Sequence, residues 1–343
     1  MAVSDAAPRL VEVATRAGVS MATASRALSG STGVSRTMAH HVREVAAEMG
    51  YVANLHARSL AGGPTTVVGL VVHEIGDPYF SEIASGVLSV AAAEGLTVQI
   101  CHSGRDPASE LTQIRTLIAN RVGAIIVAGS GFLDPRAQAE VTSALRVYRA
   151  RGGRVSVIGR HHLAADAVLP DNCAGGRSIA EHLLGLGHER IGLACGSRAL
   201  TTVHDRLHGV SEALKACGRS LDELPAVEAE FTRDGGKAAG ETLLDQHPDL
   251  TAVIALNDDM AIGVLSVLRD RGVGVPGRVS VTGFDDVAVA GDLAPSLTTI
   301  RLPMAEMGRQ ALRMALAPTT VRPRRKGTGH ALVVRDSTGP PPA

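Results

Sequence analysis

Polar and aromatic side chains that could bind a small molecule follow several apolar runs of the sequence. Tyr79 and Phe80 lie after the first of these runs, and Asn257 and Asp285 lie directly after two later ones. If the runs are parallel strands, their carboxyl ends meet at one edge of a sheet and bring these distant residues together. Carboxylate, amide and aromatic groups in one cleft suit a sugar or another polyol.

The sequence offers no convincing catalytic or metal-binding pattern. His40–His41 and His161–His162 are adjacent pairs, whereas helical metal ligands stand four residues apart on one face. The glycine segments GSGF (130–133) and GGR (175–177) lack the G-x-G-x-x-G spacing of a dinucleotide site. No combination of serine, histidine and acidic residues in the sequence indicates a catalytic nucleophile with its general base. We therefore expect no enzyme, no cofactor and no metal site.

From residue 67 onward, apolar runs alternate with helical stretches. The runs are VVGLVV (67–72), LTVQI (96–100), AIIVAG (124–129), VSVIG (155–159), RIGLACG (190–196), TAVIAL (251–256), VSVTGF (279–284) and a last strand, HALVV (330–334). This alternation predicts parallel sheets covered on both faces by helices. The series restarts around 163–169, which predicts two α/β halves with a cleft between them.

Residues 9–53 have the periodicity of short helices instead. We expect helices at 10–17, 21–28 and 36–49, with Ser20 and Ser35 as N-caps. Three short helices joined in this way predict a helix-turn-helix unit. Residues 1–8 are expected to be a disordered leader. Residues 54–64 are expected to be a linker that is helical only when a binding partner holds it, because so short a helix is only marginally stable on its own.

The composition is typical of a soluble protein of about two domains. Of the 343 residues, 45% are apolar and 20% are charged, and the net charge is zero. Residues 1–64 nevertheless hold six arginines and four acids, a net charge of +2, which leaves −2 for the other 279 residues. The four cysteines are far apart, the N-terminus is not apolar, and no apolar run reaches the roughly 20 residues that span a bilayer. We expect a cytoplasmic protein with no membrane partner.

Motifs with specific spacing run along nearly the whole chain. They include VATRAGVSMATASRALSG (13–30), MGYVAN (49–54), ARSLAGG (57–63), DPYF (77–80), DRLHGV (205–210), ALNDDMAIGVL (255–265) and VPGRVSVTGFDDV (275–287). Together they resemble the lactose/galactose repressor (LacI-type) family of bacterial transcription regulators. The resemblance implies an all-α helix-turn-helix head plus an α/β periplasmic-binding-protein-like core of two parallel-sheet subdomains. It implies a homodimer, and a core (65–343) divided into about 65–165 plus 297–343, and 166–296.

The resemblance also implies binding to double-stranded DNA at a palindromic operator. The implied DNA-binding residues are Ser20, Met21, Ala22, Thr23, Arg26, Ser29, Asn54 and Leu60. Ser20 and Thr23 would contact phosphates, whereas Met21, Ala22 and Arg26 would face base edges. Ser29 stands where an asparagine is usual, and its shorter side chain reaches less far toward a DNA phosphate. Asn54 would begin a hinge helix whose Leu60 wedges into the minor groove.

Three of these roles have alternatives. Arg26 is also compatible with a solvated surface arginine, and Met21 with a residue that only excludes water. Leu60 is also compatible with packing between two subunits.

In the core, the resemblance implies an effector site. The implied effector-binding residues are Tyr79, Phe80, Arg160, Arg206, Phe231, Asn257 and Asp285. Arg206 and Asp285 would hydrogen-bond the effector, and Phe231 would stack on it. A structural ion pair between Arg206 and Asp285 across the cleft is the alternative, and Phe80 is equally compatible with the core. Many relatives carry an acid where this chain has Gly159, which would favour an anionic or less hydroxylated effector.

These inferences predict a ligand-responsive transcription regulator. The favoured form is a dimeric repressor that a small sugar-like effector releases from its operator, located in the cytoplasm with the nucleoid. One alternative is a co-repressor-dependent regulator of the same family. A cytosolic sugar-binding protein and a sugar-acting enzyme are less favoured, because the head suits DNA and no catalytic set is present.

Overall fold

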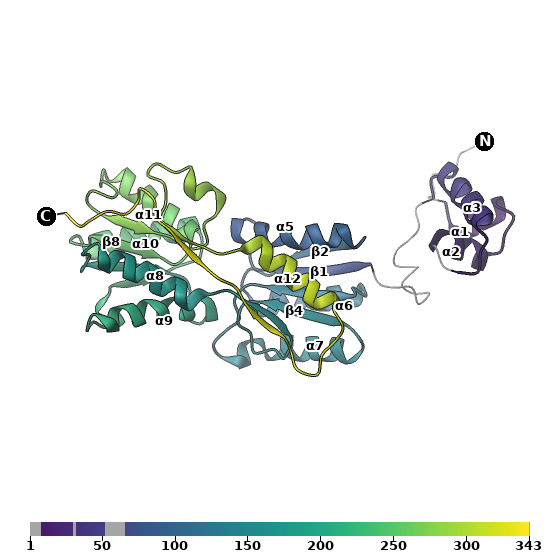
Figure 1. The fold of residues 1–343 in the computed structure, drawn as a ribbon, viewed down its shortest axis with the longest axis horizontal. Helices are drawn as coiled ribbons and strands as arrows, with labels where there is room; N and C mark the ends of the chain where they lie inside the picture. Colours follow the sequence, from purple (N-terminus) through teal and green to yellow (C-terminus); the bar gives the residue numbers. More distant parts are fainter. Residues whose placement is uncertain (1–7, 30–31, 52–65, 343) are drawn as a thin grey trace. The chain divides into compact units, whose positions relative to one another are not determined.

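A computed structural model of the chain describes residues 8–29, 32–51 and 66–342. These residues form two compact units, one that ends at Thr66 and one that begins at Val67 (Figure 1). The expected hinge helix at 54–64 lies outside the described residues, as does the expected leader except for its last residue. Both therefore stay predictions.

The first unit is a three-helix head, as the periodicity predicts. Its helices are α1 (Leu10–Arg16), α2 (Met21–Ser29) and α3 (Arg36–Glu48). Ser35 caps α3, because its hydroxyl accepts a hydrogen bond from the backbone N–H of Met38 at 3.3 Å. The head has its own small core of apolar side chains, which are Val13, Ala14, Ala17, Ala24, Ala27, Val42, Val45 and Ala46.

The first half of the core is a six-stranded parallel sheet in the order β11-β5-β4-β3-β1-β2. Its strands are β1 (Val67–Val72), β2 (Thr97–His102), β3 (Ala124–Ala128), β4 (Arg154–Ile158), β5 (Asp166–Leu169) and β11 (Arg325–Gly327). Helices α5 (Pro78–Ala93) and α12 (Met304–Leu316) pack together on one face. Helices α6 (Pro107–Ala119) and α7 (Ala139–Ala150), the latter preceded by the 3-10 turn η1 (Pro135–Gln138), cover the other face.

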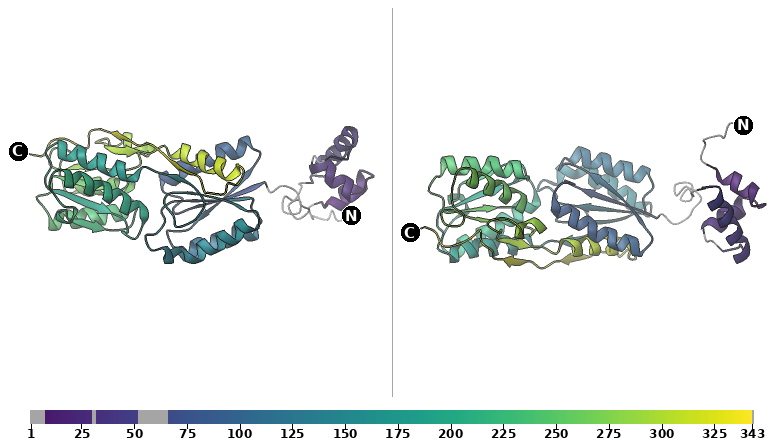
Figure 2. Two further views of the ribbon diagram at one scale, coloured as in Figure 1. Left: turned by 60° about the horizontal axis from the view of Figure 1, so that its bottom comes forward. Right: turned by 90° about the horizontal axis from the view of Figure 1, so that it is seen from above.

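The second half repeats this layered plan with a four-stranded parallel sheet in the order β7-β6-β8-β9. Its strands are β6 (Ile191–Cys195), β7 (Ala226–Glu228), β8 (Ala252–Ala255) and β9 (Ser280–Thr282). Helices α8 (Asn172–Gly185) and α9 (Thr201–Ala216) form one layer, and α10 (Arg233–Gln246) and α11 (Asp258–Asp270) form the other (Figure 2). Short 3-10 turns, η2 (Leu221–Glu223) and η3 (Ala288–Gly291), lie in the connections.

The predicted fold class is confirmed, and each apolar run in the sequence overlaps a strand. The sequence pattern does not predict four short strands, namely β5, β7, β10 (Thr299–Arg301) and β11. β10 pairs with β12 (Ala331–Val333) in a two-stranded antiparallel ribbon. β11 (RKG) has no apolar residue and belongs to the sheet only through its backbone pairing with β5. Such strands carry no hydrophobic period that a sequence reading could detect.

The strand pairing differs in two places from the expected division of the core into about 65–165 plus 297–343, and 166–296. β5 pairs with β4, so the strand at 166–169 belongs to the first half and the second begins with α8. The C-terminal segment does not stay with the first half either, because the backbone N–H of Val281 in β9 donates to the Ser337 carbonyl at 2.9 Å. Figure 1 shows this segment in yellow, running from α12 across to the second half. Backbone pairing thus links these segments differently from the boundaries that the family resemblance implies.

Helices α8 and α9 approach each other closely because glycines stand at their contact. A Cβ added to Gly209 of α9 would lie 1.8 Å from the Cys173 carbonyl oxygen of α8. A Cβ added to Gly176 of α8 would lie 2.1 Å from the Arg206 carbonyl oxygen of α9. The two backbones are therefore in contact, with no room for a methyl group between them.

Replacing Gly209 with alanine should consequently destabilise the core. We expect the free energy of unfolding to fall by about 1–3 kcal/mol, since the helices must separate to admit the methyl group. Urea unfolding followed by circular dichroism measures this. Gly185→Ala is the matched control, because its Cβ would meet nothing within 4 Å in the same helix layer. An equal effect of the two substitutions would contradict the close-packing account.

Candidate functional site

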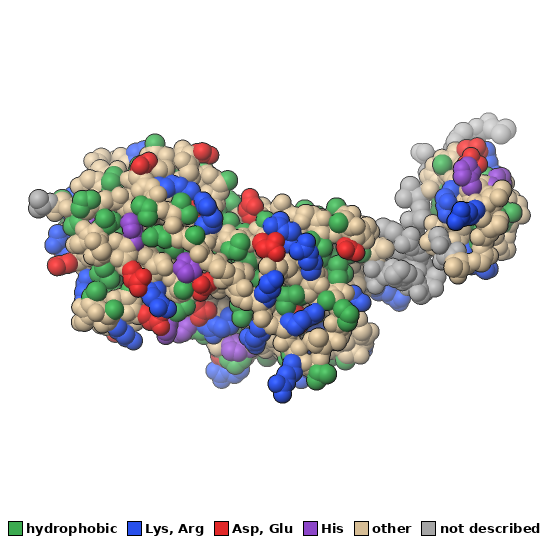
Figure 3. Space-filling model, in the orientation of Figure 1, with side chains coloured by type: hydrophobic (Ala, Val, Ile, Leu, Met, Phe, Trp, Pro, Cys, Tyr) green, Lys and Arg blue, Asp and Glu red, His purple; other side chains and the backbone are tan. Residues whose placement is uncertain are grey.

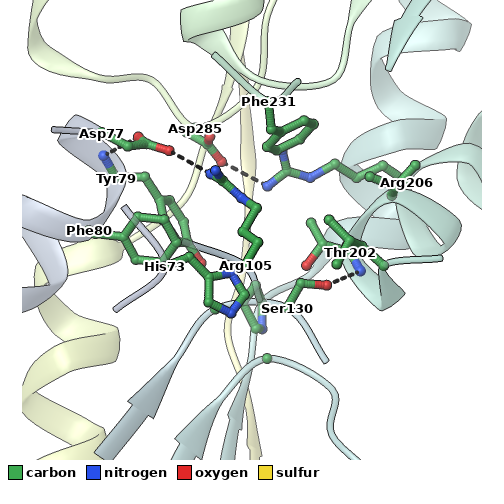
Figure 4. Close-up of a pocket in the computed structure, with 15 residues that line it drawn as sticks. His73, Asp77, Tyr79, Phe80, Arg105, Ser130, Thr202, Arg206, Phe231 and Asp285 are labelled. Carbon is green, nitrogen blue, oxygen red and sulfur yellow. Dashed lines mark hydrogen bonds and ion pairs between the residues drawn. The ribbon is translucent and has the colours of Figure 1, made fainter. Parts of the chain in front are cut away.

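A cavity of about 40 Å³ lies between the two halves of the core (Figure 4). Its lining comes mostly from loops and helix starts that follow parallel strands, as expected for α/β sheets. The polar and aromatic lining residues of the first half are His73, Asp77, Tyr79, Phe80, Arg105 and Ser130. Those of the second half are Thr202, Arg206, Phe231 and Asp285. Five of the seven predicted effector-binding residues are among them, namely Tyr79, Phe80, Arg206, Phe231 and Asp285.

The other two predicted residues do not line the cavity. Asn257 caps α11, since its Oδ1 accepts from the Met260 N–H at 2.9 Å, and it is only 1% exposed. Its Nδ2 donates to the Phe231 carbonyl at 3.4 Å, so Asn257 holds a lining residue without reaching the cavity. Arg160 is drawn away by a bidentate ion pair with Asp205, with N–O distances of 2.6 and 3.1 Å.

Arg206 and Asp285 form a buried ion pair on one side of the cavity. Arg206 Nη2 donates to Asp285 Oδ1 at 2.8 Å, and its Nε donates to Asn172 Oδ1 at 2.9 Å. The Arg206 guanidinium also lies 3.6 Å over the ring of Phe284. Burial raises the pKa of Asp285, while the charge of Arg206 opposes that rise. The ion-pair alternative is thus partly right, but both residues belong to the second half and the pair does not cross the cleft.

The backbone at Asp285 is held in an uncommon conformation. Its φ is +117°, a region that side-chain-bearing residues rarely adopt. The backbone N–H of Asp285 donates to the Ile300 carbonyl at 2.7 Å, which fixes the loop against the segment that returns to the first half. Strain of this kind is typical of functional sites.

Arg105 occupies the middle of the cavity. It follows β2 with a φ of +58°, and its side chain reaches from the first half toward the second (Figure 4). The guanidinium lies 3.6 Å from Asp77 and 5.7 Å from the centre of the Phe231 ring. Burial raises the pKa of Asp77 to about 6, and its carboxylate also caps α5 through the Tyr79 N–H at 2.9 Å. Arg105 therefore connects an acid of one half to an aromatic ring of the other.

His73, in the cavity wall, forms a buried pair with Glu110 without a hydrogen bond. Their Nε2 and Oε2 atoms are 3.9 Å apart, and each residue is 2% exposed or less. Burial lowers the pKa of His73 to about 3 and raises that of Glu110 to about 7. Among the described residues, Glu110 has one side-chain hydrogen-bond partner, Gln138, whose Nε2 donates to Oε1 at 3.1 Å.

Glu110→Gln should therefore stabilise the protein in a pH-dependent way. The folded-state pKa of Glu110 lies above its unfolded value of about 4.5, so wild-type stability falls as the pH rises through 7. Glutamine does not ionise, and the gain in melting temperature should be largest above pH 7 and fade toward pH 4.5. Glu140→Gln, at a side chain that is 77% exposed, should show no such trend. A loss of stability in Glu110→Gln that is equal at pH 5 and pH 8 would contradict this assignment.

In the head, the predicted DNA-binding residues of the described part cluster on α2 and its cap. Ser20 Oγ accepts from the Thr23 N–H at 3.1 Å, and the two hydroxyls are 2.9 Å apart. Met21 is 55% exposed, Ala22 and Arg26 are exposed, and Thr23 is half-buried. Arg26 Nε donates to the Ala22 carbonyl at 3.2 Å, and the Ser29 hydroxyl donates to the Arg26 carbonyl at 3.2 Å. The start of α2 thus presents hydroxyls, an apolar side chain and a guanidinium to solvent.

Asn54 and Leu60 lie outside the described residues, so their roles stay predictions. In the part of the chain that the structure describes, no helix has both the length and the apolar character needed to cross a membrane.

Known proteins with similar sequences decide the family. Residues 9–54 match the family described as bacterial regulatory proteins, lacI family, and residues 180–338 match a periplasmic binding protein-like domain. The HTH-type transcriptional regulator DegA of Bacillus subtilis (strain 168) is 32% identical over 338 residues, which cover 96% of this chain and 98% of DegA. This chain belongs to the LacI family.

Two further relatives extend the comparison of this LacI-family protein. The HTH-type transcriptional regulator GalR of Escherichia coli (strain K12) is 33% identical over 321 residues, covering 91% of this chain and 89% of GalR. A solved structure, described as the transcriptional regulator CelR–cellobiose complex, is 31% identical with a TM-score of 0.71, covering 96% of this chain and 99% of that chain. These relatives are transcriptional regulators, which agrees with the prediction that this LacI-family protein is not an enzyme.

Sequence reasoning missed several lining residues of this LacI-family protein, namely His73, Asp77, Arg105, Ser130 and Thr202. A signal was present for four of them, because His73, Asp77, Arg105 and Ser130 all come within a few residues after a predicted strand. The rule that drew attention to Asn257 and Asp285 applies equally to these positions. Thr202 carries no such signal, since it lies at the start of a helix.

Proposed function

We propose that this protein is a ligand-controlled repressor that binds a palindromic operator as a dimer and is released by a small sugar-like effector. One observation carries the proposal: a chain with a helix-turn-helix head also has a core cavity lined by buried charges and aromatic rings from two separate halves. Such a cavity can bind a ligand with an affinity that depends on how the halves are arranged. A ligand that prefers one arrangement shifts the population toward it.

The chemistry of the cavity favours a polyhydroxylated ligand with an apolar ring face. Arg206 and Arg105 supply donors, Asp285 and Asp77 supply acceptors, and Phe231 supplies a face for stacking. The cellobiose in the CelR complex is consistent with this class of ligand. Gly159, which stands where many relatives carry an acid, lines the cavity, and Arg105 supplies a positive charge there, whereas Arg160 is paired with Asp205.

The cavity must change before a sugar can occupy it. Its volume of about 40 Å³ is far below the roughly 300–1,000 Å³ of typical ligand sites. Withdrawal of Arg105 from Phe231, or separation of the two halves, would supply the space. Effector binding is thereby linked to a movement of the core, which is what a signal to the head requires.

For the DNA side we propose the contacts that the family resemblance implies. Ser20 and Thr23 would hold phosphates, Met21, Ala22 and Arg26 would face base edges, and Ser29 would lie near the backbone. Asn54 and Leu60 would form the hinge that bends the operator centre. Two heads on one palindrome supply an affinity that one head with a net charge of +2 could not. A protein with this task acts in the cytoplasm, on the nucleoid.

A thermal-shift screen of sugars, sugar phosphates and nucleobases on the full-length protein tests this function. A ligand that binds only the folded state raises the melting temperature. The true effector should also lower the affinity for the protein's selected DNA, and Phe231→Ala should lose both effects. If the stabilising ligands leave DNA binding unchanged, release by an effector is excluded, and if they tighten it, the protein depends on a co-repressor instead.

A further inference from the structure

A cluster of three potential metal ligands lies on α8 and α9, away from the cavity lining. Cys173 stands in the first turn of α8, and His208 and Glu212 stand one turn apart on α9. Cys173 Sγ lies 3.4 Å from His208 Nδ1 and 3.7 Å from Glu212 Oε2, and His208 Nδ1 lies 3.7 Å from Glu212 Oε1. In the described residues this is the one group of at least three histidine, cysteine and acidic side chains close enough to share an ion.

These distances match the edges of a zinc coordination tetrahedron. Zinc binds sulfur at about 2.3 Å and nitrogen or oxygen at about 2.0–2.2 Å, so tetrahedral ligand atoms lie about 3.3–3.6 Å apart. The separation of 3.4 Å between Cys173 Sγ and His208 Nδ1 falls in this range, and one ligand atom from each of the three side chains lies within 4.8 Å of the other two. Glu212 Oε2 lies 3.7 Å from Cys173 Sγ, whereas Oε1 lies 3.7 Å from His208 Nδ1, so rotation of the carboxylate would bring one oxygen to an ion shared by all three side chains.

The ligand set also has the right chemistry. A thiolate, an imidazole and a carboxylate together favour zinc over magnesium or calcium, which prefer oxygen ligands alone. The side chains of His208 and Glu212 are 57% and 39% exposed, so an ion can reach them from solvent. Three protein ligands leave a fourth position open to water, beside the exposed His204, whose ring centre is 6.4 Å from that of His208.

The surroundings hold these ligands in place. The contact of α8 with α9 at Gly209 brings Cys173 within reach of His208, the residue next to that glycine. Arg177 Nη2 lies 3.1 Å from Glu212 Oε2, which orients the carboxylate while leaving Oε1 toward His208. Figure 3 shows acidic, basic and histidine side chains together on the surface over α8 and α9. His208 and Glu212 stand four residues apart on one helix, but the sequence could not place Cys173 beside them, because it is 35 residues from His208.

We propose that Cys173, His208 and Glu212 bind one zinc ion per chain on the outer surface of the α8–α9 pair. Zinc displaces the thiol proton that Cys173 donates to Glu212, and that proton leaves to solvent. The ion then joins the two helices next to the effector site, because Asn172, the neighbour of Cys173, accepts the hydrogen bond from Arg206 Nε. Zinc would thereby rigidify the support of Arg206.

Cobalt(II), a spectroscopic substitute for zinc, tests the proposal on the reduced full-length protein. We expect one equivalent to give a thiolate-to-cobalt charge-transfer band that zinc then removes. Cys173→Ser and His208→Gln should each abolish the band and weaken zinc binding at least about tenfold, since loss of even an indirect ligand partner costs 10–100-fold. Cys217→Ser, at an exposed free cysteine, is the matched control and should keep both the charge-transfer band and the affinity for zinc.

A wild-type measurement keeps the test independent of variant folding. Zinc should slow the alkylation of Cys173 by iodoacetamide and leave that of Cys217 unchanged, as read by peptide mass spectrometry. A charge-transfer band that survives in folded Cys173→Ser, no band in the wild type, or equal alkylation with and without zinc would overturn the site. None of these readouts involves DNA or a sugar, so their failure is distinct from failure of the proposed function.

Discussion

Replacing Arg206 with alanine should lower the free energy of unfolding by about 3–5 kcal/mol, the usual cost of removing one partner from a buried ion pair. Arg206 is 2% exposed and Asp285 is 4% exposed, so the remaining carboxyl group would have no solvent to replace the guanidinium. The hydrogen bond to Asn172 Oδ1 and the contact with the Phe284 ring would be lost as well. The same variant should not respond to the effector.

Urea unfolding of the full-length protein measures this cost, and two variants make it specific. Arg271→Ala removes an arginine of similar size from a surface pair with Asp245 and should cost no more than about 1 kcal/mol. Adding Asp285→Asn to Arg206→Ala should recover part of the loss, since no buried charge then remains. A cost for Arg206→Ala as small as that of Arg271→Ala would contradict the buried-pair description.

Replacing Arg26 with alanine should remove most of the sequence-specific DNA affinity. A guanidinium that pairs with a guanine edge is worth about 1–3 kcal/mol per half-site, so a dimer on two half-sites should lose about 2–6 kcal/mol. That range corresponds to at least a roughly thirtyfold weaker operator complex. Non-specific binding should change far less, because it depends on the total positive charge.

A gel-shift titration against the selected operator and a scrambled duplex separates these two effects. Arg43→Ala on α3 is the matched control, since it removes the same exposed charge from another helix of the head. We expect it to weaken both duplexes slightly and equally. Unchanged operator affinity in Arg26→Ala would leave Arg26 as a solvated surface arginine.

Much of the fold could be predicted because its signals are local and repeated. The apolar runs at β1, β3 and β6 are buried on both faces, so their composition alone identifies them. Two helices of the head, α2 and α3, begin after serines that cap them. The short strands β7 and β11 could not be predicted, because they form through backbone pairing with strands elsewhere in the chain and their own residues carry no strand signal.

The residues of the candidate site divide in the same way, into those that a local sequence signal marks and those that contacts elsewhere in the chain place. Asp285, Tyr79 and Phe80 could be located because they follow strongly apolar strands. Arg105 also follows an apolar run, but its place over Phe231 depends on a loop that bends with positive φ, which the run does not predict. Arg160 and Asn257 do not line the cavity, because Arg160 pairs with Asp205 and Asn257 donates to the Phe231 carbonyl, and residue spacing does not show which partner a side chain finds. Their role in effector binding stays a prediction.

The most direct test of the central claim, that two heads of one dimer read a palindrome, is selection of DNA by the full-length protein from a random duplex library at physiological salt. We expect the enriched sequences to show two-fold symmetry and to bind about 10³-fold or more tighter than random duplex. Arg26→Ala should enrich no such sequence. If the wild-type protein binds no palindrome better than random duplex under these conditions, the account of this chain as an operator-binding repressor is wrong.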